Sequence, residues 1–130
     1  MQQRNPEMSD FALTNARVLG NDDFHTGHAV LVQDGKVAAV LPESALPAGV
    51  PCHDLGGGWL LPGFIDVQVN GGGGALLNNT PDVDALRAMM RGHRRYGTTG
   101  MLPTLISDDA AVMEKAIAAV RQAIAEGVPG

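Results

Sequence analysis

The second half of the chain alternates strand and helix patterns, and this order constrains the fold more than any other feature. Residues 64–70 alternate apolar and polar side chains, which is the period of a β-strand. Residues 80–96 and 107–126 carry apolar side chains at helical spacing, and a β-rich run at 98–106 lies between them. This order is typical of parallel sheets with right-handed crossovers. We therefore predict an α/β fold in which helices cover the strands.

The sequence also indicates where both helices begin and end. Thr80 is expected to cap the first helix, with Pro81 at its first position and Gly97 just after its end. Ser107 is expected to cap the second helix, and Gly127 to follow its last turn. The side chains expected to face the core are Val83, Leu86, Met90 and His93 in the first helix, and Met113, Ile117, Val120 and Ile124 in the second.

Residues 10–62 predict a small β module. Two short apolar runs flank Asp34-Gly35, a dipeptide suited to the left-handed positions of a type I′ hairpin turn. Residues 52–62 have room for one short strand before their glycines and one after. We predict a mostly antiparallel, β-sandwich-like module, preceded at residues 1–9 by a poorly ordered lead-in.

The chain is short for the architecture that its second half begins. Its 130 residues are far fewer than the roughly 250 of a complete (β/α)8 barrel, also called a TIM barrel. Two strands and two helices do not close a sheet, and the chain ends at Gly130, where a third strand would begin. We therefore expect residues 63–130 to hold the first two β/α units of an incomplete, truncated barrel, in a chain that is a fragment or relies on other chains.

Charge and cysteine content indicate the class of partner. The formal net charge of -5 argues against nucleic acid and against an anionic membrane surface, although a local pocket can still accept an anionic substrate. Cys52 is the single cysteine and suits a reducing compartment. No run approaches the roughly 18 apolar residues of a membrane span, and the first ten residues do not resemble a signal peptide. We expect a cytoplasmic protein.

The strand at residues 64–70 carries an unusual polar face. Alternation turns Ile65, Val67 and Val69 to one side and Asp66, Gln68 and Asn70 to the other. In an antiparallel strand the polar face would simply meet water. In a barrel strand it would point into the lumen, and its last members would lie at the carboxyl-end mouth, where barrel active sites sit. We predict that this mouth comprises Gln68, Asn70, Gly71, Gly72 and Thr104.

Four glycines, Gly71–Gly74, follow this strand. Converging backbone N–H groups of glycines can cradle a phosphate. However, the helix is not expected to start before Thr80, and no Gly-Lys-Ser/Thr ending follows. We favour a bent, close-packed loop at the barrel mouth.

The isolated histidines do not predict a metal site. His25 and His28 would face opposite ways on a regular strand, and no Cys or carboxylate cluster accompanies them. His53, beside Cys52, is a similar lone residue. His93 falls on the apolar stripe of a helix, where a partly buried structural role is expected.

Two segments carry a family resemblance. "GGGWLLPGFIDVQVNGGGG" at 56–74 and "YGTTGMLPTLIS" at 96–107 resemble the N-acetylglucosamine-6-phosphate deacetylases of the amidohydrolase superfamily. The first-strand motif of that superfamily is Pro-Gly-x-Ile-Asp-x-His-x-His, whose two histidines bind a metal. Pro62, Gly63, Ile65 and Asp66 match it, whereas Gln68 and Asn70 stand at the two histidine positions. The resemblance extends from about Phe11 to Ile124.

The resemblance implies a hydrolase that converts N-acetylglucosamine 6-phosphate to glucosamine 6-phosphate and acetate. In that family a divalent metal, usually zinc, activates water and polarises the amide carbonyl. The family's principal ligands are a Glu in a His-Leu-Glu-Gly-Pro segment and two later histidines, none of which this chain contains. We therefore expect no catalytic residue and no bound metal here, an inactive fragment, and a homo-oligomeric full-length enzyme.

The replacement of two histidines has a chemical consequence. Carboxamide oxygen is a weaker zinc ligand than imidazole. Gln68 and Asn70 are therefore expected to hydrogen-bond a metal-bound water or to fill a vacant second-metal position, and the full enzyme to use one metal.

Two alternatives stay open. The first is another amidohydrolase, either an N-acetylgalactosamine-6-phosphate deacetylase or a dihydroorotase-like enzyme; the missing His-x-His counts against the latter. The second is a non-catalytic module that self-associates through the exposed edges of its half-barrel.

Overall fold

The computed structural model describes residues 10–130, so the expected lead-in at 1–9 lies outside the described residues. The chain divides between Pro62 and Gly63 into two compact units. The first unit holds β1 (Phe11–Leu19), β2 (Phe24–Gln33), β3 (Lys36–Pro42), the 3-10 helix η1 (Glu43–Ala45) and β4 (Cys52–Leu60). The second holds β5 (Phe64–Val69), β6 (Gly71–Gly72), β7 (Ala75–Leu76), α1 (Val83–Arg94), β8 (Thr98–Pro103) and α2 (Ala110–Ala125). Within 10–130, no helix is long and apolar enough to span a bilayer.

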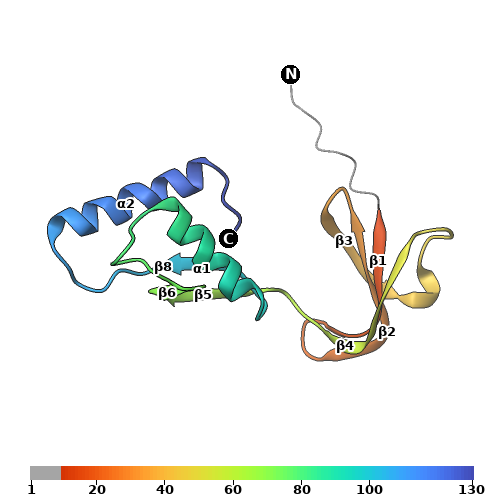
Figure 1. The fold of residues 1–130 in the computed structure, drawn as a ribbon. Coiled ribbons are helices and arrows are strands. Elements are labelled where there is room, and N and C mark those ends of the chain that lie inside the picture. Colours follow the sequence, from red (N-terminus) through yellow and green to blue (C-terminus); the bar gives the residue numbers. More distant parts are fainter. Residues whose placement is uncertain (1–9) are drawn as a thin grey trace, which may run out of the picture. The chain divides into compact units, whose positions relative to one another are not determined.

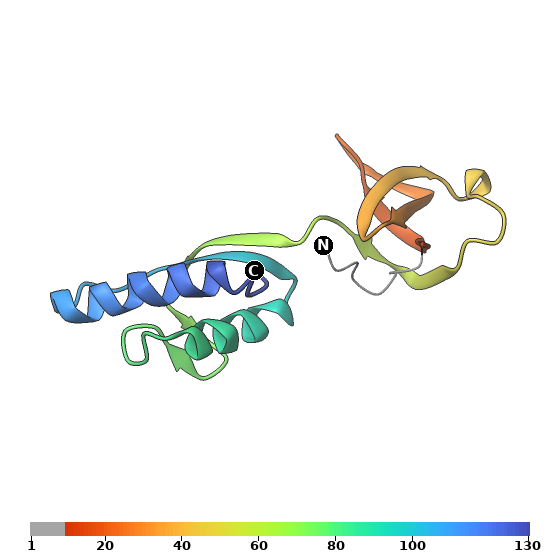
Figure 2. The ribbon, with the colours of Figure 1, turned by 90° about the horizontal axis from the view of Figure 1, so that it is seen from above.

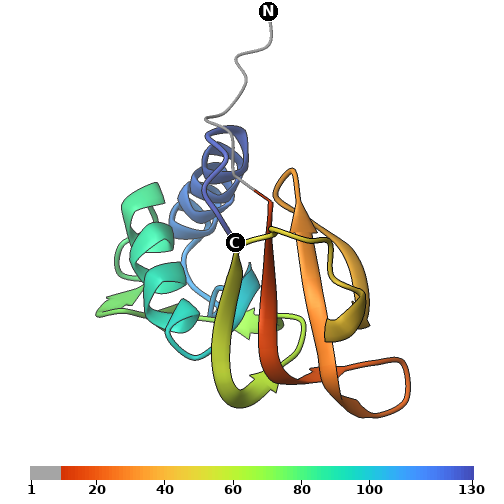
Figure 3. The ribbon, with the colours of Figure 1, turned by 90° about the vertical axis from the view of Figure 1, so that its right-hand side faces the viewer.

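The first unit is a four-stranded sheet in the order β3-β2-β1-β4 (Figure 3). The β1–β2 and β2–β3 pairs are antiparallel, and the β1–β4 pair is parallel. The prediction of a mostly antiparallel module is therefore confirmed. Its described residues form one sheet, so the sandwich-like second layer stays a prediction.

The turn between β2 and β3 has the predicted chemistry. Asp34 and Gly35 have φ of 49° and 73°, the left-handed values that a type I′ turn requires. Gln33 pairs with Lys36 across this two-residue turn. The local dipeptide was sufficient to locate this hairpin.

Strand β4 differs from the expectation of two short strands separated by glycines. It runs unbroken, and its register slips between the pairs Thr14–Asp54 and Ala16–Gly58. Gly56 and Gly57 take φ of 62° and 77° at this irregularity. Glycine adopts such angles without strain, so the strand absorbs the extra residues as a bulge and continues.

The second unit follows the predicted strand–helix order. Strands β5 and β8 pair in parallel, and α1 and α2 lie on the same face of this pair (Figures 1 and 2). The core of the second unit contains the buried residues Val69, Leu77, Val83, Leu86, Met89, Ala116, Ala119 and Ala123.

Both helix starts were predicted too early. Asp82 caps α1 by accepting a hydrogen bond from the Ala85 N–H at 2.8 Å, whereas the Thr80 N–H closes the preceding turn on the Leu76 carbonyl. In α2 the N-cap is Asp109 rather than Ser107, and it makes no side-chain capping bond. The predicted ends hold, because Gly97 and Gly127 take φ of 93° and 65° just after their helices.

The buried face of α2 is also not the predicted one. Ala116, Ala119 and Ala123 are buried, whereas Met113, Ile117 and Ile124 are exposed; of the predicted stripe, Val120 packs partly buried on the core. Alanine at spacings of three and four residues allows close contact between helices. Both the alanine face and the neighbouring face of larger side chains have helical spacing. The sequence pattern pointed to the face of larger side chains, but the alanine face is the buried one.

Candidate active-site mouth at the ends of β5 and β8

Strand β5 does not alternate simply along its length. Val69 is 2% exposed and joins the helical core, whereas Ile65 and Val67 are 72% and 70% exposed, so the three apolar side chains of β5 do not share one environment in this chain. The register explains the difference, because Asp66 pairs with Met101 while Val69 pairs with Pro103. Between these two pairs β5 advances by three residues while β8 advances by two. The extra residue on β5 is a β-bulge, which changes the side of the sheet to which the following side chains point.

The side chain of Asp66 lies at this bulge. Its Oδ1 accepts a hydrogen bond from the Gln68 N–H at 3.1 Å. The Gln68 side chain is exposed, and no hydrogen bond joins it to Asn70 or Thr104.

Asn70 and Thr104, two of the residues predicted for a barrel mouth, contact each other directly. Asn70 Nδ2 donates to the Thr104 carbonyl at 3.0 Å. The Thr104 N–H donates in turn to the Val69 carbonyl at 2.8 Å, and its hydroxyl donates to the Leu102 carbonyl at 3.1 Å. The carboxyl ends of β5 and β8 are therefore tied to each other through a half-buried carboxamide.

The glycine loop packs closely against α1. A Cβ on Gly92 would lie 2.6 Å from the Gly73 nitrogen, and a Cβ on Gly72 would lie 2.5 Å from His93 Nε2. The same His93 Nε2 lies 2.9 Å from the Gly71 carbonyl oxygen. The loop contacts the carboxyl-terminal half of α1 rather than a helix amino terminus, which favours the close-packed interpretation over a phosphate cradle.

Asn78 was missed by the sequence reasoning. Its Nδ2 donates to the Ile106 carbonyl at 2.9 Å and to Asp108 Oδ2 at 2.8 Å, and its Oδ1 accepts from the Ile106 N–H at 3.0 Å. Hydrogen bonds from Asn78 and from the Asp109 N–H hold the pKa of Asp108 below its ordinary value. The Asn78-Asn79 dipeptide carries the composition of a turn, and that signal alone gave no reason to assign it a partner.

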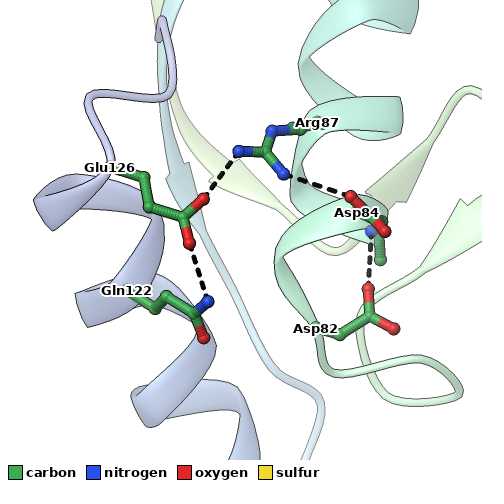
Figure 4. Close-up of polar contacts among 6 residues, drawn as sticks. Asp82, Asp84, Arg87, Gln122 and Glu126 are labelled. Carbon is green, nitrogen blue, oxygen red and sulfur yellow. Dashed lines mark hydrogen bonds and ion pairs between the residues drawn. The ribbon is translucent and has the colours of Figure 1, made fainter.

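A chain of charged groups joins the two helices of the second unit (Figure 4). Arg87 lies 3.1 Å from Asp84 and 2.6 Å from Glu126, and Gln122 donates to Glu126 at 2.7 Å. Hydrogen bonds from Gln122 and then Arg87 lower the pKa of Glu126, and those to Asp84 and Glu126 raise the pKa of Arg87. This network fixes the start of α1 relative to the end of α2.

The side chains of Gln68 and Asn70 do not amount to a metal site. Across residues 10–130, no group of three or more His, Cys, Asp or Glu side chains is placed to hold a metal ion. Gln68 and Asn70 offer only carboxamide oxygens as ligands, and these bind zinc more weakly than imidazole does. These residues alone do not fit a divalent cation.

The lone histidines have local structural contacts. The rings of His25 and His28 lie 5.2 Å apart, rather than on opposite faces as predicted, because Gly27 at φ 67° bends the strand between them. His53 packs edge-on against Phe11.

Comparison with known proteins gives a consistent result. Residues 10–60 match the family model described as the NagA composite domain. The chain is 43% identical over 126 residues to an N-acetylgalactosamine-6-phosphate deacetylase of Shewanella sp. (strain ANA-3), covering 94% of this chain and 32% of the relative. It is 32% identical over 112 residues to an N-acetylglucosamine-6-phosphate deacetylase of Haemophilus influenzae, covering 86% and 29%.

A crystal structure also matches this fold. The N-acetylglucosamine-6-phosphate deacetylase from Pasteurella multocida superposes with a TM-score of 0.85 at 34% identity, over 89% of this chain and 31% of that one. The chain thus spans about a third of the length of the curated relatives it matches.

Proposed function

Because the chain belongs to the NagA-type amino-sugar-phosphate deacetylase family, we propose that it is the amino-terminal part of an enzyme that hydrolyses N-acetylglucosamine 6-phosphate to glucosamine 6-phosphate and acetate. The observation that carries the deacetylase part of this proposal is the match at 43% identity, over 94% of the chain, to a curated amino-sugar-phosphate deacetylase that is named for the galacto sugar. The structural match to an N-acetylglucosamine-6-phosphate deacetylase supports the same class.

The alternative substrate is N-acetylgalactosamine 6-phosphate. The relative with 43% identity is named for this substrate, whereas the structural match at 34% identity is named for the gluco sugar. The two sugars differ only in the configuration of one ring hydroxyl, so the residues that contact this hydroxyl determine the preference.

We propose that the β5–α1–β8–α2 segment forms the first two units of a (β/α)8 barrel. The parallel β5–β8 pair and the helices on one of its faces support this. Ile65 and Val67, exposed on β5, would then be covered by further elements of the barrel. Asn70 and Thr104 would lie at its carboxyl-end mouth, where barrel enzymes bind substrate.

We further propose that the active enzyme uses one divalent metal, with zinc preferred. A bound zinc would supply Lewis-acid polarisation of the amide and an activated water. The described residues do not make such a site, so Gln68 and Asn70 are assigned hydrogen bonding at the mouth, where a carboxamide can both donate and accept. A metal content near two per active subunit would contradict the single-metal proposal.

The remaining properties of the enzyme are proposals from the same family membership. We propose a cytoplasmic homo-oligomer that acts on an amino-sugar phosphate and binds neither nucleic acid nor membrane. The isolated 130-residue chain should release no acetate, because its described residues hold no complete metal site.

Product identification tests the proposed function. The complete enzyme is incubated with each N-acetylated hexosamine 6-phosphate, and acetate and free amine are followed by proton NMR. The sugars without phosphate serve as controls. Stoichiometric acetate from either phosphorylated sugar is expected; absence of acetate from both would overturn the proposal.

A further inference from the structure

Asn78 forms a two-way hydrogen-bonded pair with the backbone of a single residue. Its Oδ1 accepts from the Ile106 N–H at 3.0 Å while its Nδ2 donates to the Ile106 carbonyl at 2.9 Å. The same amide donates to Asp108 at 2.8 Å. A carboxamide offers a donor and an acceptor side by side, as a backbone peptide does in a strand pair. Aspartate has the same shape but no donor when ionised.

These bonds join the two loops that leave the carboxyl ends of β5 and β8. Asn78 lies between β7 and α1, and Ile106 lies between β8 and α2; Figure 1 places both loops at the same end of the unit. Leu77, beside Asn78, is buried in the core at 1% exposure, so the loop that carries Asn78 is anchored. Thr104, two residues before Ile106, holds the Asn70 amide.

We propose that Asn78 is a positioning residue of the deacetylase, which holds the β8–α2 loop in register and so fixes Asn70 and Thr104 at the mouth. This inference rests on the proposed function. Asn78 acts through the backbone of Ile106 rather than through contact with substrate. Small displacements of groups at a reaction site lower turnover steeply, so loss of this tie affects kcat more than KM.

The test substitutes Asn78→Asp in the complete enzyme. The change removes both donated bonds and places a carboxylate against Asp108. Asn79→Asp is the matched control, because it adds the same charge at the exposed neighbouring asparagine. We expect Asn78→Asp to lower kcat for acetate release about tenfold or more with KM within about threefold, while Asn79→Asp stays near wild type. Adding Asp108→Asn removes the like-charge contact and should restore part of kcat.

A kcat for Asn78→Asp equal to that of wild type, or an equal loss in Asn79→Asp, would overturn the assignment. Hydrogen exchange supplies a readout that needs neither substrate nor a stable variant, because the Ile106 amide should exchange more slowly than the Ser107 amide in the wild-type enzyme. Fast exchange at Ile106 would contradict the tie. A third outcome is that the wild-type enzyme releases no acetate while the Ile106 amide is protected from hydrogen exchange. In that case the deacetylase proposal and the catalytic role of Asn78 fail, but the hydrogen-bonded link between Asn78 and Ile106 is supported.

Discussion

His93 Nε2 lies 2.9 Å from the carbonyl oxygen of Gly71, and this contact joins the last turn of α1 to the residue that follows Asn70. The carbonyl can only accept, so Nε2 must carry the proton.

Substitution of His93 by alanine should therefore loosen the glycine loop. The Gly71 carbonyl loses its partner, and a net loss of about 1 kcal/mol in the free energy of unfolding is expected. Urea unfolding measures the change, with His25→Ala as the control because His25 is exposed on the β module. Equal unfolding midpoints for both variants would show that the contact contributes nothing to stability.

Replacing Gly92 by alanine is expected to destabilise the protein, which is the opposite of the usual effect of this change inside a helix. Replacing glycine by alanine inside a helix normally stabilises by about 1 kcal/mol. Here the added Cβ would lie 2.6 Å from the Gly73 nitrogen, so Gly92→Ala should destabilise by about 1–3 kcal/mol through overpacking. Thermal unfolding measures the sign, and Ala118→Gly on the exposed side of α2 gives the reference for propensity alone. A raised Tm for Gly92→Ala would contradict the close packing of loop on helix.

The Arg87 network should respond to salt. Replacing Arg87 by methionine removes its contacts with Asp84 and Glu126 and should lower Tm at low ionic strength. These groups are partly exposed, so the difference between variant and wild type should shrink as salt screens the charges. Thermal melts at about 0.02 M and 0.5 M salt test this. A Tm difference independent of salt would assign the effect to packing instead.

The lowered pKa of Asp108 gives a pH-dependent prediction. A folded pKa below the unfolded value of about 3.9 stabilises the fold above that pH, and this contribution is lost as the pH falls through the folded pKa. The Asn78 amide is the largest cause of the shift, so Asn78→Ala should raise the pKa of Asp108 towards its ordinary value. A carbon-detected NMR titration of the Asp108 carboxyl measures it. An unchanged pKa would mean that the Asn78 contact is absent in solution.

The parts of this fold that could be predicted are those determined by short stretches of neighbouring residues. Asp34-Gly35 defines a hairpin through two left-handed residues, and Gly97 and Gly127 mark helix ends in the same way. The β5–α1–β8–α2 order followed from the alternation in residues 64–70, the helical spacing of apolar residues in the two helices and the β-rich run between them.

The other parts depend on partners distant in the chain. The bulge at β5 arises from pairing with Met101 and Pro103, and the buried alanines of α2 are selected by the closeness of α1. Asn78 was missed because its partner Ile106 lies 28 residues away. Hydrogen bonds at this separation leave no periodic signal in the sequence.

The central claim is that the carboxyl end of β5 forms part of the mouth of a deacetylase active site. The most direct test is kcat/KM for acetate release by the complete enzyme carrying Asn70→Ala, compared with Val37→Ala, which alters an exposed side chain on the β module. We predict that Asn70→Ala lowers kcat/KM about tenfold or more, whereas Val37→Ala leaves it near the wild-type value. Wild-type kcat/KM in the Asn70→Ala enzyme would contradict the placement of this strand end at the active site.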